Sequence, residues 1–177
     1  LTHANFVFIT YSGVNSMPDI AMKPNRRLLL FLPLAHVFAR YMQFFCFAGN
    51  GSLGLASNLT TILADFKAFK PTFILAVPRI FEKIYNAASQ KAGAGFKGRV
   101  FADATQTAYD WSHAQQSGGS IPLALNAKHA LYNKLVYSSI MEVFGGHVEY
   151  AVSGGAPLDS SIAHFFNGVG LSLLEGY

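Results

Sequence analysis

The stretch VSGGAPLDSS, residues 152–161, combines small residues, a serine, a proline and an aspartate in a pattern that could serve chemistry. A β-prone run leads into it, and Asp159 is a favourable N-cap for the helix expected next. A loop of this kind between a strand and a helix could cradle a phosphate, expose Ser153 as a nucleophile, or only turn the chain.

A nucleophilic Ser153 would resemble the G-x-S-x-G elbow, with Ala151 in place of the first glycine. Only Asp159 and His164 follow as possible triad partners, and both fall in the next short helix, too close to reach around a sheet. Pro157 interrupts the helix that an elbow needs directly after its serine. It also lacks a backbone N–H, which weakens a phosphate cradle. An α/β-hydrolase-like esterase using Ser153 therefore stays only an alternative.

Two other patterns could carry chemistry. GAGFKG at residues 93–98 matches G-x-G-x-x-G, but it follows a helical pattern instead of a strand, so we predict a loop between helices. The histidines show no metal-ligand spacing, and we expect no metal site. His36 follows the end of a buried strand, where ligands bind in open α/β sheets. It is a candidate site residue, with a structural role at a helix start as the alternative.

The elements that must position these residues alternate along the chain. Apolar runs predict strands at residues 27–32, 51–57, 72–77, 147–153 and 171–176. Helical patterns occupy residues 3–17, 35–49, 58–70, 78–92, 97–116, 122–144 and 158–168, with Asn58 as an expected N-cap. Strands separated by helices predict an α/β fold, a mostly parallel sheet flanked by helices. Three loops, those after residues 32, 153 and 176, should then meet at one edge and form a crevice.

Composition limits the class of protein. The 177 residues fit one domain, and 51% of them are hydrophobic while only 12% are charged. A chain this apolar is core-rich, lipid-facing or a piece of a larger protein, and its start without methionine leads us to expect a piece. The net charge of +4 is scattered, without a basic stripe bearing aromatics, so we expect no nucleic-acid partner.

Residues 28–49 are long enough to span a bilayer, but Arg40 near their middle argues against insertion. Peripheral contact with a membrane stays open. The single cysteine, Cys46, lies in an apolar run and predicts a buried thiol in a reducing compartment, hence a cytoplasmic location. The sequence leaves the oligomeric state undetermined.

Five motifs in order (LTHAN, FLPLAHVFAR, AVPRIFEKIYN, SGGAPLD and LLEGY) resemble the adenylate-forming, or AMP-binding, superfamily. The second and third are most similar to long-chain acyl-CoA synthetases. The resemblance runs over residues 1–177 and implies a partial adenylation domain. The family's phosphate loop would precede Leu1, and its Thr-Glu pair and C-terminal domain would follow Tyr177. We therefore expect this piece to be inactive alone, with open sheet edges and marginal stability.

The resemblance also implies roles for residues. Those that match the family's adenylate (ATP and AMP) contacts are Gly154, Gly155, Ala156, Pro157, Glu175, Gly176 and Tyr177. The small residues would line the adenine, and Tyr177 would stack on its other face. His36 and Phe38 match the acyl and carboxylate pocket, with His36 a candidate catalytic residue, and His3 would be structural.

The implied reaction uses ATP with Mg²⁺, a fatty acid and coenzyme A. The carboxylate attacks the α-phosphate to give acyl-AMP and pyrophosphate, and the thiolate of coenzyme A then displaces AMP. This chemistry needs no enzyme nucleophile, which agrees with the absence of a triad. Besides the esterase, a non-enzymatic lipid- or membrane-associated module remains an alternative. Medium-chain or aryl acids and a carrier-protein acceptor also stay open.

Overall fold

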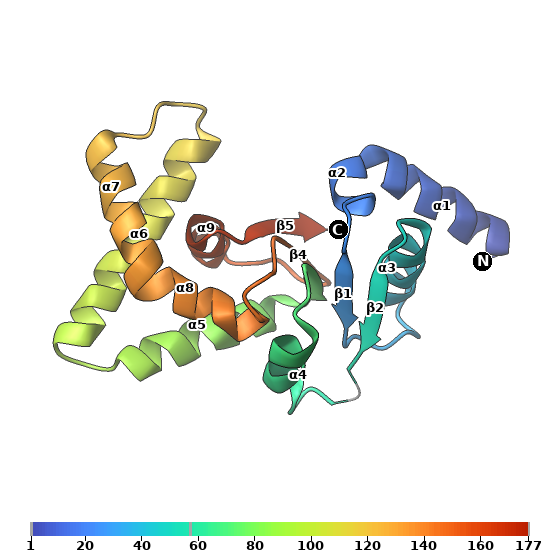
Figure 1. The fold of residues 1–177 in the computed structure, drawn as a ribbon, viewed down its shortest axis with the longest axis horizontal. Helices are drawn as coiled ribbons and strands as arrows, with labels where there is room; N and C mark the ends of the chain where they lie inside the picture. The colour runs from blue at the N-terminus through green and yellow to red at the C-terminus, as the bar shows by residue number, and fades with distance from the viewer. Residues whose placement is uncertain (1, 57, 177) are drawn as a thin grey trace.

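A computed structural model describes residues 2–56 and 58–176, which form a sheet with helices on both faces (Figure 1). The five strands lie in the order β2-β1-β3-β4-β5, and every neighbouring pair is parallel. They are β1 (Arg27–Leu30), β2 (Ser52–Leu55), β3 (Phe73–Ala76), β4 (Tyr150–Gly154) and β5 (Ser172–Gly176). The predicted α/β fold with a parallel sheet is confirmed.

The helices divide between the two faces of this sheet. One group is α1 (His3–Ser16), α2 (Pro18–Ala21) and α3 (Val37–Ala48). The other is α4 (Ile62–Phe69), α5 (Pro78–Ala92), α6 (Phe96–Gln116), α7 (Leu123–Tyr132), η1 (Asn133–Tyr137), α8 (Ser138–Met141), η2 (Glu142–Phe144) and α9 (Ser160–Val169). Figure 1 shows the first group beside β1 and β2, and α5 to α8 at the opposite end of the molecule.

Strand residues alternate between two hydrophobic cores. In β1 and β3, Leu28 and Phe73 pack with α1, α2 and α3, whereas Leu29 and Ile74 pack with the second group of helices. All four are buried, since both faces of the sheet are covered. Continuous apolar strands such as FILA are typical of this arrangement.

Helices α6 and α9 approach each other closely at Gly168. A Cβ atom at Gly168 would lie 2.0 Å from the carbonyl oxygen of Ala108, so only glycine permits this approach. Nearby, the buried hydroxyl of Tyr137 donates to the carbonyl oxygen of Ala104 at 2.7 Å. Burial raises the pKa of Tyr137.

Three predictions of local structure were wrong in detail. Helix α4 starts after Thr61 instead of Asn58, because the Asn58 side chain accepts the Thr60 N–H at 2.9 Å and makes a turn. The helix predicted over 122–144 is broken by the π turn η1 and ends in a 3₁₀ turn. The fourth strand begins at Tyr150, later than predicted.

Cys46 is buried, as predicted, and burial raises the pKa of its thiol. In the described ranges, the structure has no helix that combines the length and apolar character needed to cross a bilayer.

Candidate functional site

The carboxyl ends of β4 and β5 lie side by side, with Gly154 in register with Gly176. The ring of Phe38, from the first turn of α3, packs against both glycines. A Cβ atom built on Gly154 would lie 2.5 Å from Cε1 of Phe38, and one on Gly176 would lie 3.5 Å from Cζ. The first turn of α3, which follows β1, therefore meets the ends of β4 and β5 at one edge of the sheet, as predicted for the segments after residues 32 and 153. The predicted loop after residue 176 lies outside the described residues.

The loop that follows β4, residues 155–158, presents small residues to solvent. Gly155 has a φ of 84°, a left-handed conformation that favours glycine. A Cβ atom built on it would lie 4.0 Å from Cγ1 of Val77, the residue that follows β3. Gly155, Ala156 and Pro157 are exposed, whereas Gly154 is buried. The result is an exposed surface of backbone and small side chains next to Gly154, against which the Phe38 ring packs.

Glu175 holds this loop against the end of β5. Its Oε1 accepts the backbone N–H of Leu158 at 3.0 Å. Next along the chain, Asp159 caps α9, and its carboxylate accepts the Ser161 N–H at 2.8 Å. The hydrogen bonds from Ser161 lower the pKa of Asp159. Two carboxylates thus fix the C-terminal end of the loop, where it enters α9.

His36 is the N-cap of α3. Its Nδ1 accepts the Phe38 N–H at 3.3 Å, and its side chain is exposed at the same edge of the sheet. A ring nitrogen that accepts this bond carries no proton, so Nε2 bears the hydrogen of the neutral ring. The imidazole orders the turn that carries Phe38.

Ser153 does not have the geometry of a nucleophile. Its side chain is 0% exposed, and its hydroxyl has no hydrogen-bond partner among the residues that the structure describes. Helix α9 begins only at Ser160, whereas an elbow exposes its serine at a direct turn into a helix. His164 contacts the hydroxyl of Ser112 at 3.1 Å instead. The esterase alternative is therefore not supported.

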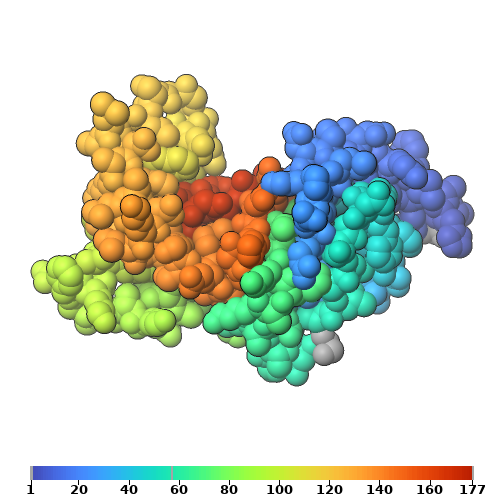
Figure 2. All heavy atoms as spheres, in the orientation of Figure 1, coloured from blue at the N-terminus to red at the C-terminus, as the bar shows by residue number. Residues whose placement is uncertain are grey.

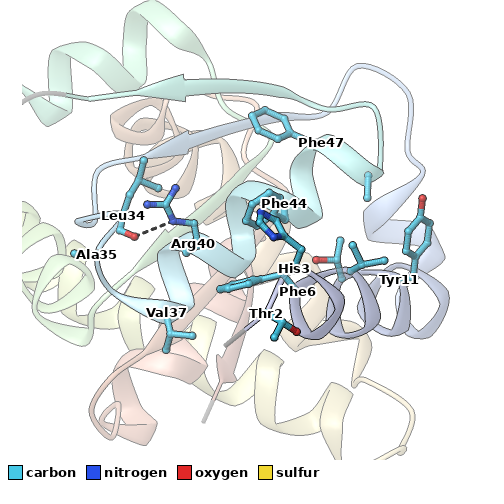
Figure 3. A pocket seen from close by; sticks show the side chains of 13 residues that line it. Thr2, His3, Phe6, Tyr11, Leu34, Ala35, Val37, Arg40, Phe44 and Phe47 are labelled. Atoms are coloured by element: carbon cyan, nitrogen blue, oxygen red, sulfur yellow. Dashed lines mark hydrogen bonds between the residues drawn. The ribbon is translucent and has the colours of Figure 1, made fainter.

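A second feature is a hollow of about 690 Å³ between α1 and α3, here called the α1–α3 trough (Figure 3). Phe6 of α1 and Phe44 of α3 both line it and pack against each other, with ring centroids 5.4 Å apart. The whole lining comprises Thr2, His3, Phe6, Val7, Thr10, Tyr11, Leu34, Ala35, Val37, Arg40, Phe44, Phe47 and Ala48. Its size and apolar character suit a hydrophobic ligand.

Arg40 is the charged residue of this lining. Its Nε donates to the carbonyl oxygen of Leu34 at 3.1 Å, drawn as a dashed line in Figure 3, and Nη1 donates to Gln43 at 3.2 Å. Val37, Arg40, Phe44 and Phe47 recur at helical spacing along one side of α3. Phe38 is absent from the lining and packs on the two glycines.

A sequence model described as AMP-binding enzyme matches residues 1–177, the whole chain. The chain belongs to the AMP-binding enzyme family. The FadD15 long-chain-fatty-acid–CoA ligase of Mycobacterium tuberculosis is 44% identical over 177 residues, all of this chain and 29% of the relative. Long chain acyl-CoA synthetase 3 of Arabidopsis thaliana is 32% identical over 151 residues, 84% of this chain and 22% of the relative.

Solved structures agree on the fold of this AMP-binding chain. The adenylation domain of a carboxylate reductase from Mycobacterium chelonae has a TM-score of 0.55 and 22% identity, covering 85% of this chain and 20% of that one. The N-terminal domain of FACL13 from Mycobacterium tuberculosis has a TM-score of 0.53 and 16% identity, covering 95% and 30%. This AMP-binding chain spans less than a third of the curated relatives named here.

Of the residues with expected roles, the structure brings together Phe38, Gly154, Glu175 and Gly176, with the exposed Gly155, Ala156 and Pro157 on the same loop. Tyr177 lies outside the described residues. His3, expected to be structural, is exposed and lines the trough of this AMP-binding chain.

The sequence-based prediction missed Val77, Leu158 and the trough. The spacing of residues 37, 40, 44 and 47 could have indicated one apolar side of α3, but α1 as the opposite wall had no sequence signal. Within residues 2–56 and 58–176, no three histidine, cysteine or acidic side chains cluster as metal ligands.

Proposed function

We propose that this chain is part of an ATP-dependent long-chain fatty acid–CoA ligase, which forms an acyl-adenylate and then an acyl-CoA. The observation that carries the proposal is the position of the first turn of α3. Phe38 on this turn supports Gly154 and Gly176, while Val37 and Arg40 line the α1–α3 trough. An adenylate and an acyl chain bound on the two sides of this turn would lie next to each other.

The adenine would lie on the loop surface formed by Gly155, Ala156 and Pro157, with Gly154 and Gly176 beneath it. A flat purine can approach backbone closely only where no bulky side chain intervenes, and this loop is exposed and small. Glu175 would keep the loop in place through Leu158, and Tyr177 would stack on the adenine. Stacking on an aromatic ring contributes about 1–3 kcal/mol per base in single-stranded nucleic acids, which sets the expected scale.

The acyl chain would occupy the α1–α3 trough. Phe6, Phe44 and Phe47 offer an apolar lining, and a long alkyl chain gains about 0.8 kcal/mol for each CH₂ removed from water. The carboxylate would lie towards His36, between trough and loop. His36, which caps α3 between the lining residues Ala35 and Val37, would orient the carboxylate with Nε2 as a donor.

The chemistry then depends on position. The carboxylate oxygen attacks the α-phosphorus, pyrophosphate leaves, and the coenzyme A sulfur later attacks the acyl carbon, releasing AMP. Holding the two reactants in line supplies much of the rate enhancement in such displacements. This chain would supply the loop, the α3 turn and the trough, and the rest of the protein would supply the phosphate loop and the C-terminal domain.

Mg²⁺ would enter with the ATP phosphates, since it usually keeps several waters and takes one or two carboxylates plus phosphate oxygens. The described residues contain no cluster of three or more candidate ligands. We therefore assign no residue of this chain to Mg²⁺ and no step to it.

We also place the protein in the cytoplasm with peripheral contact to a membrane. The buried reduced thiol of Cys46 supports the compartment, and the exposed apolar side chains of several helices support the contact.

The full-length protein containing this chain tests the proposal. Given ATP, palmitate and coenzyme A, it should release pyrophosphate and form palmitoyl-CoA in equal amounts. A series of acids from octanoate to palmitate, and aryl acids, measures the substrate range. Failure to release pyrophosphate with any acid would overturn the proposed function, and transfer only to a carrier protein would correct the acceptor.

A further inference from the structure

The turn between α5 and α6 is a basic protrusion with an exposed aromatic ring. Lys91, Lys97 and Arg99 are exposed, and the side chain of Phe96 between them is 74% exposed. No acidic residue lies between Glu82 and Asp103. We call residues 91–99 the basic tip.

The backbone of the basic tip keeps Phe96 away from the body of the protein. Gly93 and Gly95 have φ values of 65° and 85°, and a Cβ atom on Gly95 would meet nothing within 4 Å. Figure 2 shows this lime-green turn protruding at the end of the molecule opposite to α1 and α3.

Positive charge distinguishes the basic tip from the exposed apolar surface of α1. Helix α1 exposes Val7, Phe8 and Ile9 but contains no lysine, arginine, aspartate or glutamate. An uncharged apolar face suits contact with more protein. An aromatic residue flanked by three cations suits an anionic bilayer surface, where the cations lie among the head groups and the ring enters the interface.

Helix α7 and the π turn η1 that continues it add apolar area on the same side of the molecule (Figure 1). Leu123, Leu131 and Leu135 are 88%, 55% and 62% exposed, and they fall at multiples of four residues. Lys134 is exposed beside them, and Lys128 pairs with Asp103 at 2.8 Å.

We infer that the basic tip is the surface through which the protein contacts a membrane, and that its partner is a bilayer containing anionic lipids. Phe96 enters the interface, and Lys91, Lys97 and Arg99 lie against the lipid head groups. The inference rests on the peripheral membrane contact proposed above and is independent of the ligase chemistry. Each basic residue near an anionic surface raises the affinity for the bilayer about fivefold.

The test is co-sedimentation of the full-length protein with vesicles of phosphatidylcholine alone or with phosphatidylglycerol added. We expect binding only to the mixed vesicles, weakened by salt. The double variant Lys97→Glu, Arg99→Glu should reduce the affinity for the mixed vesicles by more than about tenfold. Lys67→Glu with Lys70→Glu makes the same charge change at exposed positions on and just after α4 and should have a far smaller effect.

A second pair of variants tests the ring. Phe96→Ser should weaken vesicle binding, and Phe8→Ser, at a similarly exposed phenylalanine of α1, should leave it unchanged. No binding to mixed vesicles, equal losses for both charge pairs, or full binding by the tip variants would overturn the inference. A thermal melt checks that each variant folds.

Pyrophosphate release from soluble octanoate, measured without vesicles, separates the two proposals. Tip variants that keep this activity but lose vesicle binding support the membrane surface. A protein that binds vesicles through the tip but never releases pyrophosphate would overturn the ligase and leave the surface standing.

Discussion

At the scale of single residues, the arrangement at the sheet edge depends on two glycines and one ring. Gly154 is buried under Phe38, and any side chain there would meet Cε1 at 2.5 Å. The sequence motif SGGAPLD indicated small residues for an adenine. The reason that position 154 must be glycine is a phenylalanine more than a hundred residues away, which no local pattern reveals.

Glu175 gives the first prediction at this scale. Its hydrogen bond to the Leu158 N–H makes it a residue that positions the loop. Glu175→Ala should raise the KM for ATP by up to about tenfold, because a typical intramolecular hydrogen bond contributes about 0.5–1.5 kcal/mol. The KM for the fatty acid should change less.

Glu175→Gln is the matched control, since its amide oxygen can still accept the Leu158 N–H. Steady-state kinetics of the full-length protein measure both variants. If Glu175→Gln raises the KM for ATP as much as Glu175→Ala does, the charge of Glu175 matters and the proposed positioning role is wrong.

At the scale of elements, the alternation of strands and helices was predictable from the spacing of apolar residues. Each strand is a short apolar run, and apolar residues in the helices recur about every 3.6 residues. Helix α5 has the predicted bounds, Pro78–Ala92, since proline fits its start and glycine follows its end. The π turn η1 was not predictable, because the apolar pattern of residues 122–144 continues through it. The wall of the trough was also hidden, since α1 and α3 meet only in three dimensions.

Capping of α3 by His36 is testable at this scale. His36→Ala should lower the free energy of unfolding by about 1 kcal/mol, whereas His36→Asn should retain most of it, because asparagine is a favourable N-cap. Chemical denaturation of the full-length protein measures the difference.

The same pair separates capping from catalysis. If His36 only caps α3, His36→Asn keeps kcat for pyrophosphate release. A stable His36→Asn protein with a kcat reduced by a hundredfold or more would assign the imidazole a direct role.

At the scale of the whole molecule, the chain contributes one parallel sheet, and its functional features lie at different places on it. The sheet edge carries the loop, α3 separates the loop from the trough, and the basic tip lies at the far end (Figure 1). Strands β2 and β5 are the edges of the described sheet. The relatives named above are more than three times as long, so most of their residues have no counterpart in this chain.

One turn of α3 should separate an adenylate site from an acyl site, and a split in the KM values for ATP and fatty acid tests this arrangement most directly. In the full-length protein, Val37→Trp places a bulky side chain at an exposed position of the trough lining. Gly154→Ala places a Cβ atom 2.5 Å from Cε1 of Phe38, so that the ring or the strand end must shift. Leu63→Trp and Gly119→Ala, at exposed positions elsewhere, are matched controls.

We expect Val37→Trp to raise the KM for palmitate about tenfold or more with little change for ATP. Gly154→Ala should raise the KM for ATP with little change for palmitate, since overpacking costs about 1–3 kcal/mol. If both variants raise the two KM values equally, or if each affects the other substrate, the two sites are not where this account places them.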